Sequence, residues 1–355
     1  MVQINNAVSF FLLVVGTVAH PGADILHEIR ERELALQAPN RRTVEDCRVE
    51  LEASGYYKRE LHRRLNRVNS LRAEKGSTPL AARDIDPYYA VEDVVGPRSE
   101  VDKRASCVLD PEVTEGPYWV AGELIRQDVT TGSKGIITHL DINVIDVSTC
   151  KPIPDIFVEL WGCNSTGVYT GVVAKGNGVG TAAPEEIKNN ALRGVQPTGA
   201  NGTASFITIA PGHYVGRTNH LHTIIHHGAT KLPNNTIQGG TISHVGQFYI
   251  EQAMMQTIEA TAPYNTNKQA WTKLDKDMLF SAGKAGGDDP LLQIKMLGSS
   301  IEDGIYAYID VGVNPKVAQK PSPVNIWGPN GGVPNKGSMW AGYPWTKKIR
   351  STLGL

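Results

Sequence analysis

The sequence lacks a strong net charge, a long hydrophobic run and any internal repeat. Its formal charge is -1 over 355 residues, so bulk electrostatics do not favour nucleic acid or an anionic membrane as the main partner, and we expect a small-molecule substrate. The apolar segment 7–15 is too short to span a bilayer. An apolar fraction of 41% still suits a globular protein with a sizeable core, which excludes disorder over the whole length.

That apolar segment precedes a Thr-Val-Ala pattern at 17–19, which predicts a secretory signal peptide at residues 1–19. No Lys or Arg precedes it, and the alternative interpretation is a buried N-terminal strand. We therefore expect a secreted, extracellular protein. Asn-x-Ser/Thr triplets at Asn164, Asn201 and Asn234 are compatible with export, and they leave glycosylation open.

Cysteine is scarce, and the spacing of the four residues matches no zinc pattern of the CxxC type: Cys47, Cys107, Cys150 and Cys163. In an oxidising compartment an even number of cysteines would most simply form two disulfides. Three connectivities remain open.

The chain divides into four regions: a signal peptide at 1–19, a helical N-terminal region and linker at 20–95, a β-sandwich domain at 96–313, and an extended, loop-like tail at 314–355. Apolar residues at three-to-four spacing follow a possible helix cap at Thr43 and predict one or two amphipathic helices: Leu61, Leu65, Val68 and Leu71. The basic cluster 58–67 is either a solvated helix face or a docking patch.

The middle of the chain consists of short β-type runs broken by Gly, Pro and Asn. Strand-like segments lie at 139–147, 155–163, 203–210, 218–228 and 244–252. The predicted fold class is mainly β, an antiparallel β-sandwich with an N-terminal α-helical segment and an extended Pro/Gly-rich C-terminal tail.

Two histidines, His220 and His222, are two residues apart in one of these segments. On a strand such side chains project from the same face and can converge on one ion, although ordinary histidine pairs are commoner than metal sites. Tyr169 and Tyr214 near loop ends would complete a set of two nitrogens and two oxygens, although a single tyrosine is more often a packing aromatic. Phenolate is a hard ligand that favours a trivalent cation, so this set selects ferric iron.

Three segments, "VELWGCNSTGVYTG" (158–171), "APGHYVGRTNHLH" (210–222) and "HVGQFYIEQ" (244–252), resemble in order and spacing the motifs of intradiol ring-cleavage dioxygenases. These non-haem ferric enzymes open catechols between the two hydroxyl-bearing carbons. A fourth segment, "EVTEGPYW" (112–119), looks like the one that precedes their catalytic sheet. The resemblance covers about residues 107–264 and is closest to the secreted fungal branch. It implies a catechol-type substrate, dioxygen and non-haem Fe(III). The near-neutral charge predicts no nucleic-acid or membrane partner.

The resemblance also implies a role for each matching residue. It implies four iron ligands: Tyr169, Tyr214, His220 and His222. Tyr214 would be the axial tyrosinate, which leaves the iron and accepts a substrate proton. Arg217 corresponds to the arginine over the bound substrate, and Gln247 to a glutamine that orients the ligands. The neighbouring histidines are expected to be rim or packing residues: His213, His226, His227 and His244.

Two other functions compete with this interpretation. Cleavage after residue 19 would leave His20 as a mature N-terminus of the kind that binds copper in secreted polysaccharide monooxygenases. A non-catalytic sandwich would bind carbohydrate or protein through the tail tryptophans. The N-terminal helices either mediate a homodimer, as helices do in some relatives, or cover the edge of the sandwich.

Overall fold

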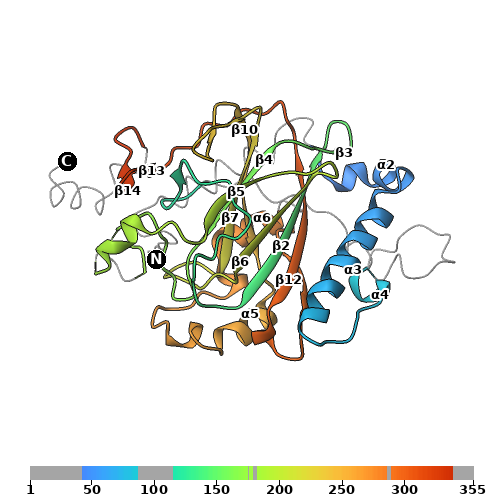
Figure 1. Cartoon of the computed structure of the whole chain (residues 1–355), viewed down its shortest axis with the longest axis horizontal. Helices are drawn as coiled ribbons and strands as arrows, with labels where there is room; N and C mark the ends of the chain where they lie inside the picture. Colours follow the sequence, from blue (N-terminus) through green and yellow to red (C-terminus); the bar gives the residue numbers. More distant parts are fainter. Residues whose placement is uncertain (1–41, 87–114, 175, 179–181, 286–288, 339–355) are drawn as a thin grey trace, which may run out of the picture.

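The computed structural model describes residues 42–86, 115–174, 176–178, 182–285 and 289–338. The predicted signal peptide, His20 and Cys107 lie outside these residues. The chain is mainly β, which confirms the predicted fold class (Figure 1). The longer strands are β2 (Ile137–Asp146), β4 (Phe157–Gly162), β5 (Arg193–Pro197), β6 (Thr203–Ile209), β7 (His220–His227), β10 (Thr241–Tyr249), β11 (Gln293–Met296) and β12 (Ile305–Val313).

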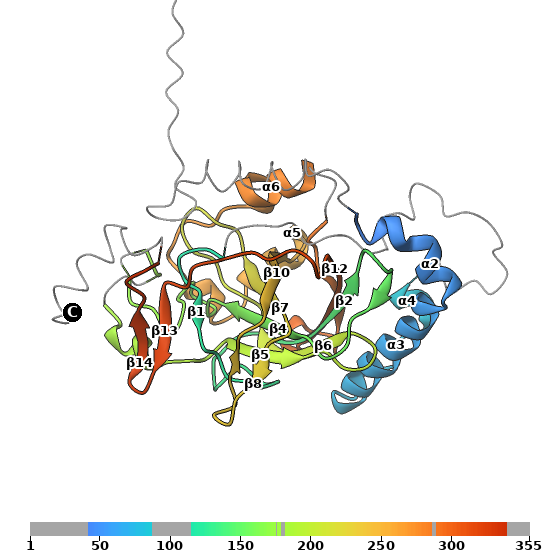
Figure 2. The same cartoon turned by 90° about the horizontal axis from the view of Figure 1, so that it is seen from above.

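Two main sheets form the sandwich (Figure 2). One has the strand order β10-β7-β4-β5, and the other has the order β11-β12-β2-β3, with β3 at Lys151–Pro152 and β6 paired to β2. Alternate residues of both sheets point into one buried apolar cluster, as the period of a strand requires. This cluster includes Leu140, Ile142, Val158, Leu160, Leu221, Ile225, Ala307 and Ile309.

All five predicted strand segments are strands in the structure, whereas β12 was not predicted. β12 is buried at every position, so its sequence shows no alternation between apolar and polar residues. It pairs with β2 in parallel, unlike the antiparallel pairs that dominate both sheets. Parallel neighbours need a long connection, which here includes α5 (Gln252–Glu259) and α6 (Met278–Ala285).

The N-terminal helices lie on the outer side of the second sheet (Figures 1 and 2). They are α2 (Arg48–Ala53), α3 (Tyr56–Glu74) and α4 (Ala82–Ile85). Thr43 lies one residue before the N-cap, Val44, of the short helical turn Glu45–Cys47, so it is not itself the predicted cap. It still supports that turn, since its hydroxyl accepts the Asp46 N–H at 3.3 Å and its own N–H donates to the Asp46 carboxylate at 2.6 Å. The apolar stripe of α3 packs on β12 through Leu61, Val68, Leu71, Tyr306 and Tyr308. The helices thus cover a sheet face, and the homodimer stays a prediction.

Buried and half-buried charges fix α3 to the sheet as well. Arg64 pairs with the Asp310 carboxylate of β12, and Arg63 donates to Asp141 of β2 at 2.5 Å. Tyr56 donates to the same Asp310 at 3.0 Å. Two arginines of the predicted basic cluster therefore face the protein, and the cluster is neither a wholly solvated face nor a free docking patch.

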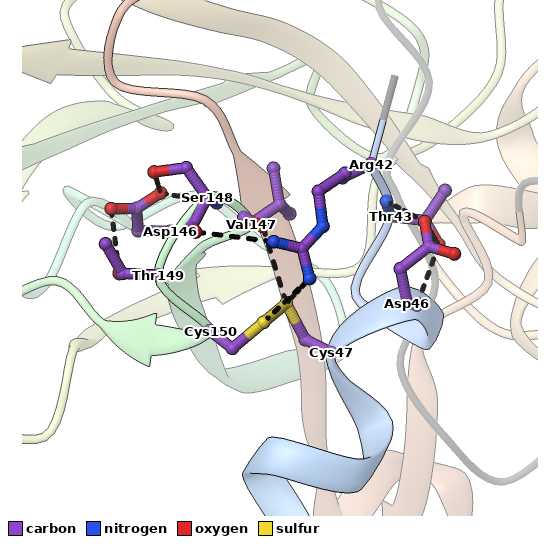
Figure 3. Close-up of a disulfide and its surroundings, with 9 residues drawn as sticks. All are labelled: Arg42, Thr43, Asp46, Cys47, Asp146, Val147, Ser148, Thr149 and Cys150. Atoms are coloured by element: carbon purple, nitrogen blue, oxygen red, sulfur yellow. Dashed lines mark hydrogen bonds between the residues drawn. A yellow bond between two sulfur atoms is a disulfide. The ribbon is translucent and has the colours of Figure 1, made fainter. Parts of the chain in front are cut away.

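The described cysteines form one disulfide, between Cys47 and Cys150, which ties the start of the helical region to the turn after β2 (Figure 3). The Arg42 guanidinium lies over it and donates to the Ser148 carbonyl at 3.3 Å. Cys163 is a free, buried thiol that donates to the Gly212 carbonyl at 3.3 Å. The expectation of two disulfides was therefore wrong, because Cys163 is a core residue rather than a bridging one.

The tail is also more regular than a loop. Its described part forms the hairpin of β13 (Asn325–Gly328) and β14 (Gly331–Pro334), and β13 pairs in parallel with β1 (Val120–Ala121). Trp327 packs against the aromatic cluster around the site. The loop-like interpretation was wrong for this hairpin, since β1 offers it an edge, whereas the expected packing of a tail tryptophan on the body is confirmed.

Candidate active site and metal centre

Strand β7 places the two central histidines side by side. His220 and His222 project from the same face, and their Nε2 atoms lie 3.1 Å apart. The Tyr169 hydroxyl lies 3.1 Å from His222 Nε2 and 3.5 Å from His220 Nε2, and the Tyr214 hydroxyl lies 3.3 Å from His220 Nε2. Each of the four side chains is at most 1% exposed. The structure thus gathers all four predicted ligands into one buried cluster.

The loop after β4 positions Tyr169 through its own backbone chemistry. The Asn164 side-chain oxygen accepts the N–H groups of residues 166 and 168 at 3.0 Å each, which folds the loop. Gly167 has φ +81°, and a Cβ atom there would meet the His213 carbonyl at 2.0 Å. Asn177 then accepts the Tyr169 N–H at 2.6 Å and donates to its carbonyl at 2.7 Å. The Asn and Gly of the recognised motif therefore aim the tyrosine.

The second tyrosine lies in the turn before β7. Gly212 precedes it, where a Cβ atom would come within 2.5 Å of the Ser165 carbonyl, so only glycine lets the two loops approach. The Tyr214 ring meets the His220 ring edge-on at 5.5 Å. The Tyr169 and Tyr214 rings are 5.7 Å apart at 71°, which brings both hydroxyls toward the histidines.

The donor atoms are spaced like the ligands of one metal ion. Ligands held about 2.0–2.1 Å from a four-coordinate metal are roughly 3.3 Å apart, close to the separations found here. His220 Nδ1 lies 2.6 Å from the Thr218 carbonyl, so this nitrogen carries the proton and Nε2 presents its lone pair to the cluster. No group of three or more His, Cys, Asp or Glu side chains suited to a metal occurs in the described part of the chain, so a metal here needs the tyrosines.

Burial strongly affects the two phenols. It raises the pKa of Tyr169 well above its ordinary value, and the neighbouring Tyr214 adds to the increase. Burial likewise raises the pKa of Tyr214, against the lowering effect of Arg217. Both phenols therefore keep their protons near neutral pH unless a cation compensates the phenolate charge, and metal binding would release these protons. The set is suited to a cation of high charge.

Arg217 belongs to a buried network beside the cluster. Its Nε donates to the Asp277 carboxylate at 2.8 Å, and its Nη2 donates to the Gln247 side-chain oxygen at 2.5 Å and to the Tyr249 hydroxyl at 3.0 Å. Arg217 and Asp277 are both fully buried. Burial alone would lower the pKa of Arg217, but the Asp277 charge raises it well above the ordinary value. The guanidinium is therefore a fixed cation.

Gln247 lies on β10 directly opposite His222 of β7, and its oxygen also accepts from Tyr249 at 2.8 Å. The structure thus brings both predicted catalytic neighbours, Arg217 and Gln247, together through a contact that their separation along the chain does not reveal. The sequence reasoning missed Asp277 and Tyr249. An Asp directly before the apolar start of α6 was the one available signal for a helix cap.

Aromatic side chains enclose the ligands. Trp161 stacks on the His222 imidazole at 4.8 Å and 6°, and Tyr118 stacks on the Tyr169 ring at 4.6 Å and 17°. Tyr118 and Trp161 are each 1% exposed. They fix the ring planes of two ligands and exclude water from that side of the cluster.

Two of the other histidines contact carboxylates instead of the cluster. His213 Nδ1 lies 2.9 Å from Glu259, and His226 Nε2 lies 2.8 Å from Glu159. Glu159 also accepts the Trp119 indole N–H at 2.8 Å. These contacts agree with the packing role expected for them.

Comparisons with known proteins give different results for sequence and for structure. No family model and no curated protein sequence matches. Among solved structures, an intradiol ring-cleavage dioxygenase from Tetranychus urticae is 30% identical with a TM-score of 0.50, covering 60% of this chain and 98% of that chain. Catechol 1,2-dioxygenase from Pseudomonas arvilla C-1 is more distant, at 19% identity and a TM-score of 0.37, with 60% and 63% covered.

The similarity to the Tetranychus urticae enzyme spans almost the whole of that protein at 30% identity, so it establishes descent as well as fold. The buried cluster of two histidines and two tyrosines agrees with the motifs that resemble this group of enzymes. The chain belongs to the intradiol ring-cleavage dioxygenase family.

Proposed function

We propose that this protein is a secreted, non-haem Fe(III) dioxygenase that cleaves catechol-type diols between the two hydroxyl-bearing carbons. Both atoms of dioxygen enter the product, a muconate-type diacid. The observation that carries the proposal is the buried cluster of four donor atoms, in which neighbouring donors lie 3.1–3.5 Å apart and His220 is in the ligand tautomer. Family membership supports the reaction class, and the donor set supports the metal.

Four residues would hold the iron: Tyr169, Tyr214, His220 and His222. When bound, ferric iron supplies Lewis acidity and the redox coupling between a chelated catecholate and dioxygen. Tyr169 is tied at its backbone by Asn177 and stacked on Tyr118, so it acts as the fixed phenolate. Trp161 fixes the plane of His222, and the Thr218 carbonyl fixes that of His220. The histidines therefore hold their geometry throughout the reaction.

A catechol that binds as a dianion loses two protons. One can pass to hydroxide or water, and the other needs a protein base close to the substrate oxygens. The Tyr214 phenolate oxygen is the protein group for this role, since burial gives the free phenol a strong affinity for a proton. Arg217 supplies a permanent positive charge beside it, fixed in direction by Asp277 and Gln247. This charge stabilises the anionic substrate and the negative charge that develops during ring opening.

The Cys47–Cys150 disulfide supports the proposed secretion, since disulfides persist in oxidising compartments. It adds to the prediction of a signal peptide at residues 1–19. Within the described residues, no helix has both the length and the apolar character needed to cross a membrane.

Oxygen uptake with a panel of catechols, combined with metal analysis and visible spectroscopy, tests the proposal. We expect bound iron, a charge-transfer band from tyrosinate to iron, and turnover that is lost in Tyr214→Phe and His222→Ala. His227→Ala is the matched control, because His227 is a half-buried histidine at the end of the same strand. Bound copper would favour the monooxygenase alternative, and a colourless, metal-free protein would favour a binding module. Unchanged turnover in both site variants would disprove the ligand assignment.

A further inference from the structure

A second buried arginine, Arg193, contacts the backbone around both stacked tyrosines. It lies on β5 opposite Trp161 of β4 and is fully buried. Its Nε donates to the Thr170 carbonyl at 2.9 Å and to the Thr170 hydroxyl at 3.1 Å, and its Nη2 donates to the Tyr118 carbonyl at 2.6 Å. The rigid Arg193 guanidinium therefore joins Thr170, the residue after Tyr169, to Tyr118, whose ring stacks on that of Tyr169.

The same guanidinium also brings charge to Tyr169. Its central carbon lies 6.0 Å from the centroid of the Tyr169 ring, within the range of a cation–π contact. Both groups are removed from water, so a charge at this distance acts with little screening. A phenolate at Tyr169 would be stabilised more than a neutral phenol.

The carboxylate nearest to Arg193 does not cancel this charge closely. Glu123 Oε1 lies 3.8 Å from Arg193 Nη1, which is too long for a hydrogen bond. Neither of these two atoms has a hydrogen-bond partner among the described residues. Burial raises the pKa of Glu123 to about 8, against the lowering effect of Arg193, so near neutral pH the carboxyl group is largely uncharged. Burial also lowers the pKa of Arg193, with Glu123 and Tyr169 acting in the opposite direction, so its positive charge is directed at the Tyr169 ring as well as at Glu123.

We propose that Arg193 is a positioning residue for the iron centre: its guanidinium holds the Tyr118–Tyr169 stack in register and keeps a positive charge beside the Tyr169 ring. This inference rests on the proposed function, because it assumes that Tyr169 binds iron as a phenolate. The charge lowers the energy of the phenolate electrons, so it raises the energy needed to transfer one to iron. Arg193 thus tunes both iron affinity and the colour of the protein.

The test compares the wild type with Arg193→Met and Arg193→Lys by ferric-iron titration of metal-free protein, the position of the visible band, and urea unfolding. Arg193→Met removes both the charge and the hydrogen-bonded fork. We expect about tenfold weaker iron binding, as for one lost charge-assisted hydrogen bond, and a band at longer wavelength. Arg193→Lys keeps the charge without the fork, so it should weaken iron binding while the band stays near its wild-type position.

Arg126→Met is the matched control. Arg126 donates twice to the Arg193 carbonyl, at 2.9 and 2.6 Å, and so supports the same strand without touching either tyrosine. It should lower stability but leave the band unchanged. An equal band shift in Arg126→Met and Arg193→Met would overturn the specific role of Arg193.

Iron affinity and band position that are both unchanged in Arg193→Met would also overturn it. If that variant does not fold, Arg193→Lys decides, and wild-type iron affinity in it contradicts the positioning role. Wild-type protein that takes up no ferric iron would refute the proposed function itself, which is a separate outcome.

Discussion

Replacing Asp277 by asparagine removes a charge from the centre of a buried network while keeping the shape of the side chain. One carboxylate oxygen accepts from Arg217 Nε at 2.8 Å and from the Thr218 N–H at 2.9 Å, and the other accepts the N–H groups of Leu279 and Phe280 at 3.0 Å each. Asp277 therefore caps α6 and holds the proposed substrate arginine at the same time. It is fully buried.

The expected loss of stability follows from these contacts. An amide has a single oxygen, so one pair of hydrogen bonds survives and the other pair faces an NH2 group that cannot accept. Arg217, itself fully buried, also loses its ion-pair partner. Breaking one partner of a buried ion pair costs about 3–5 kcal/mol, and a helix cap contributes about 1 kcal/mol. We expect the variant to lose about 3–5 kcal/mol of its free energy of unfolding.

Urea unfolding monitored by circular dichroism measures this loss, and turnover of a catechol measures its functional effect. Because Arg217 would lose the charged partner that holds its Nε and would be positioned by Gln247 and Tyr249 without it, we expect kcat/KM to fall by about tenfold or more. Asp275→Asn is the control, since Asp275 is a largely exposed carboxylate two residues earlier. A loss of less than about 1 kcal/mol in Asp277→Asn would refute the reasoning, because it would mean that Arg217 does not depend on this carboxylate.

Three further perturbations test separate parts of the fold. Burial raises the pKa of Glu123 from 4.5 to about 8 in the folded protein, so the folded state holds a proton that the unfolded chain releases. The free energy of unfolding should therefore fall as the pH rises between these values. Glu123→Gln should flatten that dependence on pH in urea titrations at pH 6 and pH 9. The Cys47–Cys150 bond closes a loop with a sequence separation of 103, so the double Ser variant should lose about 3–5 kcal/mol of stability in the same assay, and an unchanged midpoint would contradict this. Asp310→Ala removes the carboxylate that buried Arg64 contacts and leaves Glu60 at 3.9 Å, so limited proteolysis should cut the N-terminal helices faster than in the wild type. Equal cleavage rates would show that this ion pair does not hold them.

The ligand set was predicted from the sequence through its resemblance to the motifs of intradiol dioxygenases, and local geometry accounts for part of that prediction. His220 and His222 share one face of one strand, and strand alternation places them together whatever the rest of the fold does. Tyr169 and Tyr214 follow motifs whose Asn and Gly residues build the loops that aim them. The alternation of apolar and polar residues in β2 and the three-to-four spacing of apolar residues in α3 are also local patterns, and they predicted this strand and this helix.

The supporting residues were not accessible, because they depend on pairings between distant parts of the chain. Asp277 lies 60 residues after Arg217, and Arg193 reaches Tyr118 across 75 residues. A buried Asp or Arg has no periodic signature, and its role depends on which opposite charge the fold brings near. Cys163 was misjudged for a related reason, since counting cysteines cannot reveal that one of them is enclosed in the core.

Arginines in two parts of the fold differ in how closely their charges are paired, and this difference indicates their roles. At the interface of α3, Arg63 and Arg64 each contact a carboxylate at hydrogen-bonding distance, as stability requires. Arg193, beside the iron cluster, has no such carboxylate, since Glu123 is 3.8 Å away.

Ferric iron with one tyrosinate and a catechol dianion is electrically balanced, so a second tyrosinate, at Tyr214, would add an excess negative charge until it accepts a proton. Arg193 and Arg217, on different elements, are placed to offset that excess. Arg193 therefore places a loosely paired positive charge beside the proposed iron site, whereas the charge of Arg217 is paired with Asp277. Burying the charge of Arg193 there lowers stability.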